Sequence, residues 1–151
     1  MSGRYVSFVL GTGRYCVPVE NVLQIVRPEG LLPVPKAPAF VEGVINLRGE
    51  VIPVVSLRSR MGLAPNTTAG SSRARVVVVK LGGRSCGLAV DEVREIVEIP
   101  DDGVQGDPTE AQGVRAEFIQ GVAHRGENLF LILDLPRVLS AGRDLQGASP
   151  A

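Results

Sequence analysis

Residues 40–57 read FVEGVINLRGEVIPVVSL, and residues 118–135 read FIQGVAHRGENLFLILDL, so one pattern recurs 78 positions later along the chain. Both stretches begin with Phe-x-x-Gly, contain an Arg-Gly pair and end in a run of aliphatic residues. A repeat of this kind divides the chain into units before any fold is named. We therefore interpret the chain as two copies of one small unit.

The repeat extends toward the N-terminal end of each copy with a different offset. Leu10-Gly11 and 19–22 (VENV) match Leu81-Gly82 and 90–93 (VDEV) at an offset of 71 residues. The change of offset places seven extra residues in the second copy, in the polar, Gly-rich stretch 101–117. We expect residues 1–151 to form a single domain built from the following parts: a first barrel repeat 4–62, a linker loop 63–73, a second barrel repeat 74–140 and a disordered tail 141–151.

Short runs rich in Val, Ile and Leu, separated by Gly, Pro and Asp, predict many short strands. A sheet of about five strands with one apolar face leaves no unpaired edge when it closes into a barrel. The predicted fold is mostly β, with two pseudo-twofold-related five-stranded SH3-like barrels and a short C-terminal helix at Leu135–Ser140. The two small lobes are expected to share apolar surface, with a groove at their seam. The expected strands are 4–10, 14–19, 22–26, 44–47, 51–57, 75–81, 85–90, 94–99, 118–124 and 129–134.

Composition excludes several classes of function. The 16 basic and 16 acidic residues give a formal net charge of zero, which disfavours binding to nucleic acid or to an anionic membrane. One histidine, no tryptophan and 4% aromatic residues leave little material for metal sites, base stacking or histidine-based catalysis. The sequence predicts no metal, no cofactor and no catalytic residue.

Cys16 and Cys86 lack metal-ligand spacing, and the N-terminus lacks the features of a secretory signal, so we expect free thiols in a reducing cytoplasm. No apolar run is long enough to span a membrane. Both cysteines lie in predicted strands, where they act as small apolar residues. A thiol-dependent enzyme or ligand-binding module that uses one of them, with His124 as a base, is the alternative function.

Two further stretches have a local chemical interpretation. Gly11-Thr12-Gly13 follows a strand but precedes another strand, so it predicts a hairpin turn and not a phosphate-binding loop. Asp101, Asp102, Asp107 and Glu110 lack the spacing of a calcium loop, which favours a solvated loop over a cation site.

Residues 46–50 (NLRGE) place a polar turn between apolar strands. The Arg48 guanidinium is suited to bind a carboxylate or backbone carbonyl groups. An exposed hairpin turn and a functional arginine explain this pattern equally well. The second copy keeps an Arg-Gly pair, Arg125-Gly126, one residue out of register.

The pattern over residues 35–58, together with Gly87–Val93, Phe118–Gly121 and Leu131–Asp134, resembles the CheW-like family of coupling proteins in bacterial chemosensory arrays. The resemblance covers about residues 4–140. It implies a non-enzymatic adaptor that links the cytoplasmic helical hairpin tip of a chemoreceptor to the regulatory domain of a CheA-type histidine kinase. Because that domain resembles the same duplicated barrel, other CheW-like chains are also expected as partners in rings.

The resemblance also implies partner-facing residues. Four apolar residues are expected to line the groove between the lobes: Val22, Ile25, Val93 and Ile96. Gln24 stands where many relatives carry a Glu able to pair with the arginine, so Arg48 is expected to use Glu20, Glu42 or Glu50, or to stay available for a partner. Ser56 stands where an Asp is common. The predicted partner-binding residues are Val22, Gln24, Ile25, Gly43, Asn46, Arg48, Gly49, Val93 and Ile96.

Overall fold

The computed structural model describes residues 2–63, 72–100, 103–105 and 116–139. Its strands agree closely with the expected apolar runs. They are β1 (Ser2–Leu10), β2 (Gly13–Pro18), β3 (Val22–Val26), β4 (Val41–Leu47), β5 (Glu50–Ser56), β6 (Arg75–Leu81), β7 (Arg84–Val90), β8 (Glu92–Pro100), β9 (Val104–Gln105), β10 (Ile119–Arg125) and β11 (Asn128–Leu133).

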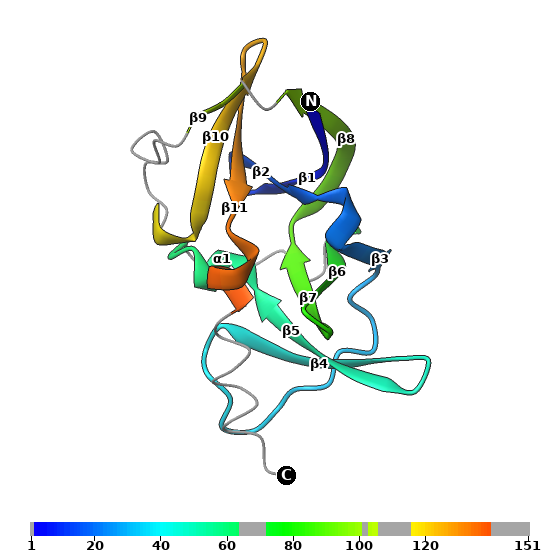
Figure 1. Ribbon diagram of the computed structural model, residues 1–151. Coiled ribbons are helices and arrows are strands. Elements are labelled where there is room, and N and C mark those ends of the chain that lie inside the picture. Colours follow the sequence, from blue (N-terminus) through cyan, green and yellow to red (C-terminus); the bar gives the residue numbers. More distant parts are fainter. Residues whose placement is uncertain (1, 64–71, 101–102, 106–115, 140–151) are drawn as a thin grey trace.

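The strands form two sheets, one above the other in Figure 1. The upper sheet has the order β8-β1-β2-β11-β10-β9, and the lower sheet has the order β3-β6-β7-β5-β4. In each sheet, the segment that follows one edge strand along the chain runs to the opposite edge. In the upper sheet β9, which follows β8, pairs with β10, and in the lower sheet Leu32, which follows β3, forms a bridge with Val44 of β4. Each sheet therefore curls. The predicted mostly-β fold of two small barrels is confirmed, with the two-residue strand β9 added to the five expected strands of the upper one.

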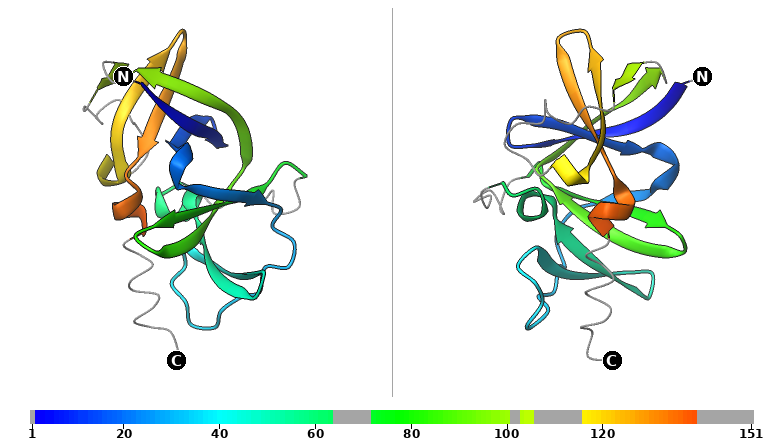
Figure 2. Two further views of the ribbon diagram at one scale, coloured as in Figure 1. Left: turned by 45° about the vertical axis from the view of Figure 1, so that its right-hand side comes forward. Right: turned by 60° about the vertical axis from the view of Figure 1, so that its left-hand side comes forward.

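The repeats exchange strands. β1 and β2 from the first half pair with β8 and β11 from the second, while β6 and β7 pair with β3 and β5 from the first. The upper barrel therefore contains two strands of the first repeat and four of the second, and the lower barrel contains three of the first and two of the second, as the colours in Figure 2 show. The sheets do not coincide with the expected barrel boundaries 4–62 and 74–140, which mark only the sequence repeats. The expected tail lies outside the described residues.

Two short helices and one short strand complete the fold, and only one of the helices was predicted from the sequence. Residues 135–139 are helical as expected, and α1 (Leu57–Arg60) is the matching helix of the first repeat, where a strand end was predicted. Ser56 Oγ accepts a hydrogen bond from the Ser59 backbone N–H at 3.3 Å, and Asp134 Oδ1 accepts one from the Arg137 N–H at 3.2 Å. The two helices thus begin with equivalent side-chain caps. β9 lies within the polar stretch 101–117, which was predicted to be a loop.

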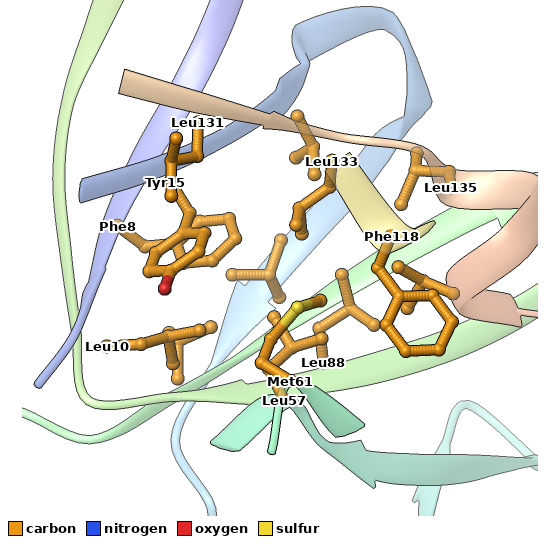
Figure 3. Close-up of a cluster of buried hydrophobic side chains, with 14 of the residues drawn as sticks. Phe8, Leu10, Tyr15, Leu57, Met61, Leu88, Phe118, Leu131, Leu133 and Leu135 are labelled. Atoms are coloured by element: carbon orange, nitrogen blue, oxygen red, sulfur yellow. The ribbon is translucent and has the colours of Figure 1, made fainter. Parts of the chain in front are cut away.

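The largest core is shared by both barrels. In Figure 3, Phe8, Leu10 and Tyr15 from the upper barrel face Leu57, Met61 and Leu88 from the lower one. Each barrel also has a smaller core of its own, around Ile132 in the upper barrel and around Ile52 in the lower barrel. The expectation that the lobes share apolar surface is confirmed.

Candidate functional site

The turn between β4 and β5 presents Arg48 to solvent. Leu47 and Glu50 face each other across the hairpin, so Arg48 and Gly49 are its two central residues. Their φ angles are 53° and 86°, and positive φ at both positions is what a type I′ turn requires. The Asn46 side-chain oxygen accepts a hydrogen bond from the Gly49 N–H at 3.0 Å, which fixes the turn.

Arg48 is an unusual residue at this position, because a side chain other than Gly is strained at positive φ. The equivalent residue of the second repeat is Gly126, with a φ of 61°. Within the described part of the chain, no ion pair joins Arg48 to Glu20, Glu42 or Glu50, and no hydrogen bond joins it to Gln24. Arg48 was expected either to pair with one of these glutamates or to stay available for a partner, and in the structure its guanidinium pairs with none of the three.

The four apolar residues expected along the seam fall into two pairs. Val22 and Val93 are partly buried and pack against the shared core, so they offer less surface than expected. Ile25 on β3 and Ile96 on β8 are 41% and 50% exposed. They occupy equivalent places in the two barrels, because Ile25 pairs with Val77 and Ile96 pairs with Val6. Gln24, which precedes Ile25 on β3, is also exposed.

Gly43 is buried and has a structural role. Its φ is 152°, and a Cβ atom there would lie 2.2 Å from the Leu32 carbonyl oxygen. The register of β4 and β5 shifts between Val41 and Gly43, as expected for a β-bulge. Gly43 therefore allows the segment after β3 to approach β4.

Two arginine contacts that were not predicted from the sequence join the repeats. Arg58 Nη2 lies 2.8 Å from Asp91 Oδ2, and the same carboxylate oxygen accepts the Gly11 N–H at 2.8 Å. Hydrogen bonding to Asp91 raises the pKa of Arg58. The Arg60 guanidinium lies 4.9 Å from the Phe40 ring centroid and 4.4 Å from that of Phe118. The signal was present, since the two phenylalanines begin the two repeated stretches.

The structure does not favour thiol chemistry. Cys16 and Cys86 are buried, and burial raises the pKa of each thiol to about 12. Reactive cysteines need the opposite shift. His124 is exposed on β10, whereas Cys16 is fully buried.

The remaining sequence candidates have simple outcomes. The Gly11-Thr12-Gly13 stretch forms the β1–β2 hairpin turn, as predicted. The four acidic residues at 101, 102, 107 and 110 lie outside the described residues. Within the described ranges, no group of three or more His, Cys, Asp or Glu residues is placed to hold a metal ion. No described helix is long and apolar enough to cross a bilayer.

Comparison with known proteins identifies the family. The model of the CheW-like domain matches residues 4–143. The chain belongs to the CheW-like family. It is 31% identical over 143 residues to the chemotaxis protein CheW of Treponema pallidum, covering 93% of this chain and 84% of that protein. It is 32% identical over 138 residues to protein FrzA of Myxococcus xanthus, covering 90% and 84%.

A solved CheW-like structure has the same fold. The scaffolding protein TtCheW from Thermoanaerobacter tengcongensis superposes with a TM-score of 0.81 at 29% identity, covering 89% of this chain and 90% of that one. Among the departures expected from the CheW-like pattern, Ser56 has a clear structural equivalent, because its hydroxyl caps α1 as Asp134 caps the helix of the second repeat. The substitution of Ser for Asp keeps the cap.

Proposed function

We propose that this CheW-like chain is a non-enzymatic adaptor of a chemosensory array, which couples the cytoplasmic tips of methyl-accepting receptors to a CheA-type histidine kinase. The family match over residues 4–143 carries the proposal. The names of the relatives support it, since they include chemotaxis proteins CheW and a scaffolding protein. The adaptor acts in the cytoplasm and is recruited to receptor arrays.

The exposed residues suit an adaptor because they lie on separate elements. An adaptor that holds two partners at once needs two surfaces that do not overlap. Ile25 on β3 and Ile96 on β8 are exposed apolar residues, to which the apolar stripe of a helical hairpin can bind. Arg48 projects from a different hairpin, where it can bind a carboxylate of a second protein.

The other proposed partner-binding residues support these contacts. Gln24 is exposed and precedes Ile25 on β3, with its side chain on the opposite face of the strand, and Asn46 and Gly49 hold the Arg48 turn. Val22, Val93 and Gly43 shape the surface from below. The two barrels present non-equivalent faces, so head-to-tail contacts with the barrel-shaped kinase domain or with other CheW-like chains are able to close into rings.

The alternative of a thiol-dependent enzyme is weaker, because both thiols are buried and have raised pKa values. A barrel that binds nucleic acid would show a steep salt dependence that a chain of zero net charge does not provide. Binding activity alone is therefore the function that the chemistry favours.

Calorimetry with the kinase regulatory domain and with a receptor tip fragment, both encoded in the same genome, tests the proposal. Binding to at least one of them in the micromolar range, about −8 kcal/mol, is expected. Arg48→Asn removes the charge while keeping a residue that tolerates positive φ, so it should lower the affinity for one partner with an unchanged melting temperature. Glu50→Gln is the matched control in the same hairpin.

Ile25→Asp tests the other surface and should weaken receptor binding, because it places a charge in an apolar contact. Val22→Asp is less informative because Val22 packs against the shared core. Wild-type protein that binds neither partner would reject the adaptor function. An Arg48→Asn variant that loses stability but binds normally would show that the arginine is structural.

A further inference from the structure

The outer surface of the β4–β5 hairpin carries apolar residues that none of the sites above includes. Ile45 and Ile52 pack in the lower core, so the alternation of a strand turns Val44, Val51 and Pro53 to the opposite side. Leu32 pairs with Val44, and Val44 pairs with Pro53. Leu32 and Val51 are each 61% exposed. We call Leu32, Val44, Val51 and Pro53 the outer hairpin face.

The internal repeat provides a comparison for this face within the same molecule. The residues equivalent to Val44, Val51 and Pro53 in the upper barrel are Val122, Leu129 and Leu131. Val122 is fully buried, Leu131 is 7% exposed, and Leu129 packs against the shared core. The same surface is therefore covered in the upper barrel and open in the lower one.

An aromatic side chain contributes to this difference. Tyr15 pairs with Leu131 in the parallel register of β2 and β11, and its ring lies beside Leu131 in Figure 3. The equivalent residue of β7 is Cys86, which precedes the Gly87 that pairs with Val54. A thiol is too small to cover a neighbouring strand as the tyrosine ring does. The outer hairpin face thus lacks the aromatic cover that its counterpart has.

A cation stands at the end of the same face. The Arg48 turn joins β4 to β5 one residue pair beyond Asn46 and Val51, and no ion pair engages its guanidinium in the described part of the chain. Glu50 pairs with Leu47, whose side chain packs against the lower core, so Glu50 lies on the side of the hairpin away from Val51. The open surface combines apolar groups with an available positive charge.

The geometry points to the outer hairpin face as a docking surface for a protein segment that presents an aromatic ring next to a carboxylate. The ring packs on the outer hairpin face, which lacks the cover that Tyr15 gives to Leu131 in the upper barrel, and the carboxylate pairs with Arg48. Exposed apolar residues grouped in this way mark interaction sites more often than isolated ones do. This docking surface adds to the proposed adaptor function, and the identification of the partner as a kinase domain or a receptor tip rests on that function.

Hydroxyphenylpropionate, a small acid with a tyrosine-like ring, tests this chemistry without any partner protein. In methyl NMR titrations, we expect saturable shifts at Leu32 and Val51, while Leu23, which is 54% exposed on β3, serves as the internal control and stays unchanged. The uncharged amide of the acid, and the acid with Arg48→Asn, should bind about two- to fivefold more weakly. Shifts that are absent, or equal at Leu23, would overturn the proposal.

The second arm uses the partners of the proposed function. Val51→Asn and Leu32→Asn should each weaken binding of the kinase domain or of the receptor tip at least fivefold, with the melting temperature unchanged. If wild-type protein binds a partner and both variants bind equally well, the docking role is rejected. If wild-type protein binds neither partner, the adaptor function fails, and the NMR titration still decides whether the face binds an aromatic acid.

Discussion

Gly43 and Gly49 show how differently two residues of one motif act at the residue scale. Both have positive φ angles, but a Cβ atom at Gly43 would meet the Leu32 backbone, while nothing lies within 4 Å of a Cβ at Gly49. Both glycines were predicted to be partner-binding residues, because a motif does not reveal which glycine faces another backbone segment. Arg48 was correctly placed in a hairpin turn, but its positive φ became visible only in the structure.

Gly43→Ala is expected to lower the free energy of unfolding by about 3 kcal/mol, since the Leu32 segment must move away from β4. Gly49→Ala should cost only about 1 kcal/mol, because it strains φ without a clash. Denaturant titration of both variants measures the difference. Equal losses would show that the close approach to Leu32 contributes nothing to stability.

At the scale of elements, the apolar pattern was sufficient to predict the strands and insufficient to pair them. Every long strand coincides with an aliphatic run. β9 spans only two residues in a polar stretch, so no aliphatic run predicted it. The helix α1 was predictable from the repeat, since Leu57 is equivalent to Leu135. Strand exchange was not, because β1 finds equivalent partners in either copy when the two copies share one pattern.

The ion pair between Arg58 and Asp91 connects two elements of the fold, and the internal repeat supplies a matched control residue for it. Asp91 joins α1 to the β1–β2 turn through Arg58 and the Gly11 N–H, and both charged side chains are 19% exposed. Asp91→Ala should therefore destabilise the fold by about 2 kcal/mol. The equivalent residue, Glu20, is exposed, so Glu20→Ala should change the free energy of unfolding by less than about 0.5 kcal/mol. Thermal or urea denaturation compares them, and similar losses would contradict this assignment.

At the scale of the whole molecule, the exchange of strands explains why a duplicated chain behaves as one unit. The shared core draws residues from both barrels and both repeats. The open outer hairpin face is recognised through the same duplication, because its counterparts Val122 and Leu131 lie in the shared core and Cys86 stands where the upper barrel has Tyr15. A sequence shows both residues, but only the pairing of β2 with β11 and of β7 with β5 reveals what each one covers.

Cutting the chain between the repeats tests this architecture. In a fragment of residues 1–63, β3 loses its partner β6, and the β1–β2 and β4–β5 hairpins lie in different sheets. We expect this fragment and the fragment 72–151 to be unfolded separately by circular dichroism and amide hydrogen exchange. Mixing them should restore strand structure and one cooperative unfolding transition, because each half supplies what both barrels lack. A half that folds cooperatively alone would mean that a repeat is able to close a barrel from its own strands.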